Sequence, residues 1–193
     1  MTTSLIIPAY YANDELRKMT ERCMQSVELD RPDEVILIVD EQKDGYTATV
    51  NRALEAAHGD ILIIGNNDLT FAPGWLTGLL RPLERGYDIA TCWTSDQDVK
   101  LEDAIEEYAK FGSLFAMTRR VYEVLGPFDG MFKGYFADLD YRRRAIDAGF
   151  NIGKNLNYVV RHDAKATYKQ TDPNDDEYLR ASRLYELKHG MLE

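Results

Sequence analysis

The chain has few cysteines and no long apolar run. Its two cysteines, Cys23 and Cys92, lie far apart among 193 residues, and we expect two buried reduced thiols rather than a disulfide. No apolar run reaches the roughly 18 residues that cross a bilayer. The N-terminus begins directly with a strand pattern, which is not the pattern of a signal peptide. These absences predict a cytoplasmic protein without a transmembrane segment.

Basic residues are also in the minority. Lys plus Arg is 23 and Asp plus Glu is 33, which gives a net charge of −10. A field of that sign repels phosphate backbones, so nucleic acid is not an expected partner, although a metal ion can still hold a phosphate locally. Six prolines, 13 glycines and 45% hydrophobic residues exclude disorder, collagen and low complexity. The length fits a single domain, residues 1–193.

The N-terminal half alternates two kinds of pattern. Short apolar runs, typical of buried parallel strands, are separated by segments with apolar residues at helical spacing. The expected strands are 4–8, 34–40, 60–64 and 88–93, with helices starting near 13, 47 and 73. This order predicts an α/β fold with a Rossmann-like, mostly parallel sheet and helices on both faces. Such sheets bind ligands beyond the carboxyl ends of their strands.

The second half is less regular. An acidic stretch at 96–107 is expected to be a solvated loop and helix face. After it we expect a strand at 113–118, a helix at 119–125, an aromatic and Gly-rich loop over a pocket at 128–136, and helices at about 138–148 and 175–189. No repeat or linker divides the chain.

Three polar residues, Asn66, Asn67 and Asp68, directly follow the third predicted strand. A carboxylate at this position can hold Mg²⁺ or Mn²⁺ that also takes two oxygens from a diphosphate. The alternative is an Asn/Asp turn, because these residues favour turns for local reasons.

Two carboxylates and one histidine in the second half are further candidates. Asp138 and Asp140 lie at a predicted helix N-terminus, where both can complement the helix dipole. The alternative is that one of the two is a general base surrounded by aromatic side chains. His162 follows a strand-like run, and a lone His is either structural or a ligand.

Taken together, these segments resemble the inverting family-2 glycosyltransferases of GT-A fold. Five motifs of that family match in the correct order and spacing over residues 3–165. They fall on Ser4–Tyr11, Val39–Glu41, Asn51–Asp68, Phe128–Gly149 and Val160–His162. The resemblance implies a GT-A fold in which residues 1–93 bind a nucleotide sugar, 94–165 form a mixed acceptor-side catalytic half, and 166–193 form a lid and a C-terminal helix.

The resemblance also implies roles for individual residues. Asp138 would deprotonate the acceptor hydroxyl, and Asp68 with His162 would hold Mn²⁺ or Mg²⁺ on the donor diphosphate. The donor nucleotide would lie against Pro8, Ala9, Tyr10, Asp40, Glu41, Asn51 and Asn67. The implied donor is a nucleoside-diphosphate sugar, with UDP first and dTDP or GDP as alternatives, and the acceptor is a glycan, a protein or a small molecule.

Three positions depart from the family pattern. Asn66 replaces the first acidic residue of the Asp-x-Asp element, so metal binding would depend on Asp68. Glu41 replaces the commoner Asp or Asn, which leaves base selectivity open, and Ala137 stands where the family usually has Glu. The chain also lacks the Gln-x-x-Arg-Trp element and membrane helices of processive synthases, so the resemblance favours transfer of a single sugar.

Other functions fit the sequence less well. A sugar nucleotidyltransferase would carry a Gly-rich segment after the first strand, and a dinucleotide oxidoreductase would carry G-x-G-x-x-G there, but residues 9–13 contain no Gly. A catalytically weak nucleotide-sugar-binding module or partner subunit stays an alternative, because Asn66 and Ala137 depart from the family pattern.

The end of the chain gives one more expectation. In the resembled family, the segment after the His often closes over the bound donor. We therefore expect residues 163–172 to form a lid, with Lys165 or Lys169 reaching the diphosphate; both lysines as solvated surface residues are the alternative. The helix from about residue 175 would pack on the domain or on a second subunit of a homodimer.

Overall fold

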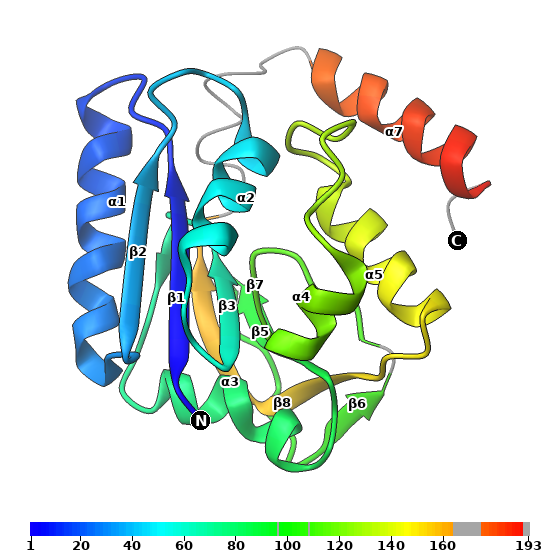
Figure 1. The fold of residues 1–193 in the computed structure, drawn as a ribbon. Coiled ribbons are helices and arrows are strands. Elements are labelled where there is room, and N and C mark those ends of the chain that lie inside the picture. Colours follow the sequence, from blue (N-terminus) through cyan, green and yellow to red (C-terminus); the bar gives the residue numbers. More distant parts are fainter. Residues whose placement is uncertain (96, 108, 164–174, 191–193) are drawn as a thin grey trace.

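One sheet of eight strands forms the centre of the molecule (Figure 1). The computed structural model describes residues 1–95, 97–107, 109–163 and 175–190. The strands are β1 (Thr3–Ala9), β2 (Glu34–Val39), β3 (Ile61–Gly65), β4 (Leu69–Thr70), β5 (Ile89–Ser95), β6 (Ile105–Glu107), β7 (Leu114–Thr118) and β8 (Ile152–His162). The helices are α1 (Asp14–Val27), α2 (Tyr46–Ala56), α3 (Trp75–Glu84), α4 (Arg119–Leu125), α5 (Ala137–Asp147) and α7 (Asp176–His189), with a 3-10 turn at Glu28–Asp30.

The sheet is mixed but mostly parallel. Its order is β2-β1-β3-β7-β5-β8-β4, with β6 paired to β8. Strand β1 is parallel to β2 and β3, and β5 is parallel to β8, whereas β7 runs antiparallel between β3 and β5. Strands β2, β1, β3, β5 and β8 therefore run in one direction, and β7, β4 and β6 run in the other. The predicted α/β fold is confirmed.

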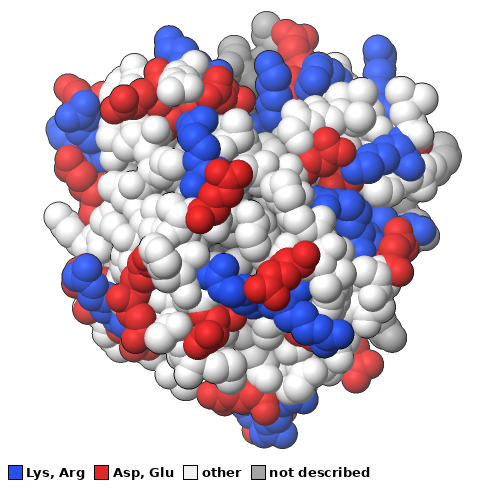
Figure 2. Space-filling model, in the orientation of Figure 1, with Lys and Arg blue, Asp and Glu red and all other residues white. Residues whose placement is uncertain are grey.

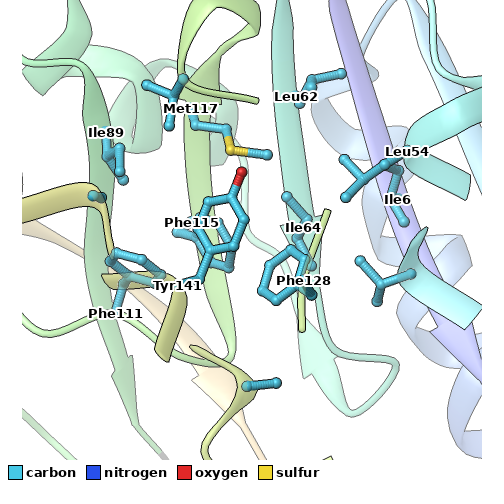
Figure 3. Packing of buried hydrophobic residues seen from close by; sticks show 14 of the residues in the cluster. Ile6, Leu54, Leu62, Ile64, Ile89, Phe111, Phe115, Met117, Phe128 and Tyr141 are labelled. Atoms are coloured by element: carbon cyan, nitrogen blue, oxygen red, sulfur yellow. The ribbon is translucent and has the colours of Figure 1, made fainter. Parts of the chain in front are cut away.

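Helices cover both faces of the sheet. Helices α2, α4, α5 and α7 bury apolar residues against one face, and α1 and α3 bury theirs against the other. On the first face Ile6, Leu62 and Phe115 from the strands meet Leu54 of α2 and Tyr141 of α5 (Figure 3). Burying a large apolar side chain contributes about 1.5–3 kcal/mol, so these two layers hold the strand ends in place.

Helix α1 begins where the sequence predicts. The Asn13 side chain accepts a hydrogen bond of 3.0 Å from the Leu16 backbone N–H, which satisfies a donor that the helix leaves unpaired. Asp14 and Glu15 follow in the first turn, where negative charge complements the helix dipole. The residues that α1 buries are Leu16, Met19, Thr20, Cys23 and Val27. This spacing matches the predicted apolar face.

Three strands differ from the sequence-based expectation, one of them the two-residue β4. The acidic stretch 96–107 contains β6, which pairs antiparallel with β8 instead of forming only a loop and a helix face. Strand β8 is 11 residues long, and its register against β5 shifts between Cys92 and Trp93. Strand β6 depends on a pairing partner that is distant in sequence, so local periodicity does not reveal it, and the strand-like run before His162 indicated only the end of β8. Through its length β8 brings His162 to the ligand-binding edge of the sheet.

The surface carries charges of both signs. On the face shown in Figure 2, basic and acidic side chains are interspersed with uncharged ones, and neither sign of charge forms a large patch. Within the described residues, none of the helices combines the length and apolar character that crossing a bilayer requires.

Candidate functional site

A cavity of about 640 Å³ lies at the carboxyl ends of β1, β2 and β3. This is the edge at which parallel sheets bind ligands. Its lining residues are Pro8, Ala9, Tyr10, Asp40, Lys43, Gly45, Tyr46, Thr49, Asn66, Asn67, Asp68, Gly112, Ser113, Lys133, Gly134, Tyr135, Phe136, Asp138, His162 and Glu177. Strand ends therefore form one side of the cavity, and the starts of α2, α5 and α7 form the other.

Among the predicted site residues that the structure describes, all but Glu41 and Asn51 line this cavity. Glu41 is exposed and does not line it. Asn51, also outside the lining, donates from Nδ2 to the Phe128 carbonyl and accepts from the Phe128 N–H, both at 2.9 Å. The Asn51 amide therefore ties α2 to the segment that precedes α5, which differs from the donor contact that the family resemblance implied.

Asp40 fixes the loop between β2 and α2. Its carboxylate accepts hydrogen bonds from the backbone N–H groups of Asp44 at 3.0 Å and Gly45 at 2.9 Å. Gly45 has a φ of 96°, and a Cβ on it would lie 2.9 Å from the Lys133 carbonyl oxygen. Only glycine combines this backbone conformation with such a close approach. The loops that carry Lys43 and Lys133 are consequently held against each other at the cavity.

Asp68 and His162 come together through strand pairing. Leu69 of β4 pairs with His162 of β8, and the Asp163 N–H donates to the Asp68 carbonyl at 3.0 Å. As a result the Asp68 Oδ1 and His162 Nε2 atoms lie 3.2 Å apart. Both atoms are buried, and neither has a hydrogen-bond partner among the described residues. At that separation the two side chains form an ion pair when His162 is protonated, and a cation held between them would satisfy both when His162 is neutral.

This pair fits a divalent cation. Carboxylate oxygen suits Mg²⁺ and Mn²⁺, and imidazole nitrogen suits the transition metals. In the described part of the chain no three or more His, Cys, Asp or Glu side chains gather where they could bind one metal ion. The described residues therefore provide two metal ligands at this position, Asp68 and His162. Mg²⁺ commonly binds in this way, through one or two protein ligands plus substrate phosphates.

The two asparagines before Asp68 position the turn. The Asn66 N–H donates to the Ser113 carbonyl at 2.8 Å, which joins this turn to the start of β7. The Asn67 side chain donates from Nδ2 to the Thr20 hydroxyl of α1 at 2.8 Å. Both residues also line the cavity. The predicted Asn/Asp turn is therefore present, and it holds the Asp68 carboxylate at the cavity wall.

Asp138 lies across the cavity in the first turn of α5. The preceding Phe136 is the helix N-cap and has a φ of 67°, an unusual conformation for a bulky residue and one that clusters at functional sites. Burial raises the pKa of Asp138 to about 6, against the opposing effect of the Leu139 and Asp138 backbone N–H groups. A Cβ on Gly112 would lie 3.0 Å from Asp138 Oδ2, so the carboxylate is closely enclosed.

Sequence comparison decides the family. The model of glycosyl transferase family 2 matches residues 11–143, which is more than half of the chain. The chain belongs to glycosyl transferase family 2. Comparison with curated protein sequences gives no match.

Solved structures share the fold of this family 2 chain at low sequence identity. GalNAc-T7 with UDP, GalNAc and Mn²⁺ has a TM-score of 0.68 at 14% identity, covering 84% of this chain and 44% of that chain. The 1–349 segment of S. aureus TarS has a TM-score of 0.66 at 14% identity, covering 100% and 67%. Glucosyl-3-phosphoglycerate synthase from Mycobacterium tuberculosis with Mg²⁺ and UDP has a TM-score of 0.66 at 15% identity, covering 100% and 80%. This chain therefore spans less than half of GalNAc-T7.

Asp140 of this family 2 chain does more than complement the helix dipole. Its side chain is fully buried and accepts from Arg144 Nε at 2.9 Å, Lys188 Nζ at 2.6 Å and His189 Nε2 at 2.8 Å. It lies in the first turn of α5 as predicted, but within the described structure its carboxylate makes no cap hydrogen bond and joins α5 to α7. Its partners on α7 lie 48 and 49 residues away, beyond the reach of any local pattern.

We therefore expect Asp140→Ala to destabilise the fold by about 3 kcal/mol, because breaking a buried ion pair leaves the other charges uncompensated. A capping residue would cost only about 1 kcal/mol. The free energy of unfolding in urea measures the difference. Asp147→Ala is the control, since Asp147 forms an exposed pair with Arg143 on the same helix and should cost well under 1 kcal/mol. Equal losses in the two variants would contradict the assignment.

Several cavity residues of this family 2 chain were not singled out by sequence reasoning, although Tyr135 was expected among the aromatic side chains near the base. They are Lys43, Tyr46, Thr49, Gly112, Ser113, Lys133 and Glu177. The sequence did point to two of the segments that contain these residues, because residues 40–45 follow a predicted strand and residues 128–136 were predicted to cover a pocket. It did not point to Glu177, which reaches the cavity only because α7 packs against α5. The predicted diphosphate contacts Lys165 and Lys169, and the lid around them, lie outside the described residues.

Proposed function

We propose that this family 2 chain is an inverting, metal-dependent glycosyltransferase that moves one sugar from a nucleoside-diphosphate sugar to an acceptor hydroxyl. The observation that carries the proposal is that Asp138 and the Asp68–His162 pair line one cavity. Displacement at an anomeric carbon needs a base on the acceptor side and charge neutralisation on the diphosphate side. The cavity offers residue types suited to both.

In the proposed reaction, Asp138 takes the proton from the acceptor hydroxyl while the hydroxyl oxygen bonds to the anomeric carbon. The bond from that carbon to the diphosphate oxygen breaks, and the electron pair leaves with the diphosphate on the side of Asp68 and His162. Because attack and departure take place on opposite faces of the carbon, its configuration inverts. When bound, a Mn²⁺ or Mg²⁺ ion held by Asp68 and His162 would neutralise the negative charge that develops on the leaving diphosphate.

The donor nucleotide is proposed to occupy the strand-end side of the cavity. Pro8, Ala9 and Tyr10 would contact the base, and Asn67 would lie near the ribose. UDP is the first choice because GalNAc-T7 and the mycobacterial synthase were both solved with it, and dTDP or GDP are the alternatives. The acceptor is a glycan, a protein or a small molecule.

Donor binding and turnover test the proposal. UDP with Mn²⁺ at about 100 times its Kd should stabilise the fold by about 2.7 kcal/mol, measured as a thermal shift against UDP with a chelator. A panel of UDP-sugars should then yield free UDP slowly with water alone and faster with an acceptor. Binding without any UDP release would favour the alternative of a nucleotide-sugar-binding module. Absence of metal-dependent UDP binding would contradict the proposal.

The pH dependence follows from the Asp138 carboxyl. A base works only when ionised, and the raised pKa of about 6 means that Asp138 is increasingly protonated below that pH. We expect kcat/KM for UDP release to fall about tenfold per pH unit below pH 6, because this constant reports the free enzyme. UDP affinity measured over the same pH range is the control. An acid limb centred near pH 4 would show that the base has an ordinary carboxyl pKa, and an acid limb that persists unchanged in Asp138→Asn would show that Asp138 is not the base.

A further inference from the structure

Helix α7 contacts α5 at the residue that immediately precedes its first turn. Phe136, the N-cap of α5, packs against two tyrosines of α7, with ring centroids 5.3 Å from Tyr178 and 5.6 Å from Tyr185. Tyr178 also meets Tyr135 edge-on at 5.3 Å. Aromatic pairs at these separations stabilise by about 0.5–1.5 kcal/mol beyond their burial. These contacts hold the backbone that leads into Asp138.

A second contact lies just beyond Asp138. Asp140 is bound by Lys188 and His189 from the last turn of α7, and Lys188 also bonds Asp129 at 2.7 Å. Burial works against the charged form of Lys188, but its hydrogen bonds to Asp129 and Asp140 outweigh it and raise the lysine pKa. The Asp140 carboxylate is fully buried, so the C-terminal end of α7 that binds it has little freedom to shift.

Between its two ends α7 buries a narrow apolar stripe. Ala181 is its one fully buried side chain in the described structure, and Leu184 and Tyr185 pack partly buried against the core, whereas Leu179 is 55% and Leu187 is 84% exposed. The aromatic and charged contacts of α7 that lie nearest Asp138 fall at Phe136 and Asp140, the positions two residues before and two residues after it.

We propose that α7 braces the base: Tyr178 and Tyr185 on one side and Lys188 and His189 on the other position the Asp138 carboxylate at the cavity. The four residues, which we call the α7 brace, are positioning residues, since none is argued to touch the reacting atoms. This inference rests on the proposed function only for the role of Asp138 as base. The placement of Asp138 itself can be tested without any substrate.

Carboxyl titration by carbon-detected NMR in the ligand-free protein is the direct test. In wild type the Asp138 signal should titrate near pH 6. In Lys188→Met/His189→Gln the first turn of α5 should loosen and admit water, so the apparent pKa should fall by about one unit toward the ordinary value of about 3.9. Lys188→Arg, which keeps the cation, and Arg183→Gln, an exposed site on α7, should titrate as wild type does.

Turnover provides the second readout. The double variant should release UDP at least tenfold more slowly from the UDP-sugar that wild type turns over fastest, because small misplacement of a reacting group is costly. Its affinity for UDP with Mn²⁺ should stay within twofold, since the brace lies outside the strand-end side of the cavity. If the double variant does not fold, Tyr178→Ala, at a site 39% exposed, takes its place with the same readouts.

The outcomes separate the two proposals. An Asp138 titration and a turnover rate unchanged from wild type, alongside a lower melting temperature, would show that α7 only stabilises the fold and would overturn the inference. If wild type fails to bind UDP with Mn²⁺, the proposed function fails instead. The substrate-free titration then still decides whether α7 positions Asp138.

Discussion

Asp138→Asn should lower the rate of sugar transfer by about 10² to 10⁴, the usual contribution of a general base. Asn keeps the size of the side chain but cannot take a proton, and Asp138 is the enclosed carboxyl with a raised pKa in the cavity. Because burial disfavours the ionised carboxylate, the wild-type fold loses stability as pH rises from about 4 to 6. The neutral Asn avoids that loss, so the variant should be at least as stable as wild type at neutral pH.

Single-turnover assays and UDP binding separate the possible roles of this residue. Donor affinity should be unchanged in Asp138→Asn, because the proposed diphosphate position lies at Asp68 and His162. Asp147→Asn, an exposed carboxylate on the same helix, is the matched control and should transfer sugar at the wild-type rate. A comparable loss of donor affinity in Asp138→Asn would assign Asp138 to the donor side instead.

Asp68→Ala should remove the metal dependence of donor binding. In metalloproteins, loss of a residue that merely supports a ligand already costs 10–100-fold, so loss of a ligand should weaken Mn²⁺-dependent UDP binding by about 100-fold or more. The fold should persist, because the strand pairing beside Asp68 uses backbone groups. Isothermal titration with UDP, in Mn²⁺ and in chelator, measures the effect.

Asn66→Ala is the control for this experiment. Asn66 lies in the same turn, and its hydrogen bond to the Ser113 carbonyl uses the backbone N–H, which Ala retains. Its Mn²⁺-dependent affinity should therefore fall much less. His162→Ala should resemble Asp68→Ala, since the facing atoms of the two side chains are 3.2 Å apart. Equal affinity in wild type and Asp68→Ala would remove the metal assignment.

Local sequence signals were sufficient for most of the fold. Buried strands such as Ile61–Gly65 are continuous apolar runs, and α1 starts at an Asn cap and has a regular apolar face, so each is specified by neighbours in sequence. Strand β7 was also expected, but not its position between β3 and β5. The order of strands in the sheet depends on which strand edges are still unpaired when the sheet assembles. The hydrophobic pattern within a strand carries no information on that order.

The candidate site was predictable to a similar degree. Position after a strand indicated Asp40 and Asp68, and both line the cavity. Dipole complementarity was a sufficient explanation for Asp140 because an acidic residue in a first helical turn is satisfied locally. Its actual partners come from the end of α7, so only tertiary structure shows that it is an ion-pair centre.

The position of β7 has a consequence for biosynthesis. Strands β3 and β5 emerge from the ribosome before β7, yet each of them pairs with β7 and not with the other. A nascent chain of 95 residues therefore has two apolar strands whose facing edges stay unpaired, a state prone to association with other chains. Residues 1–93 and 94–165 are therefore not parts of the protein that mature one after the other, and the Asp68–His162 pair takes one residue from each.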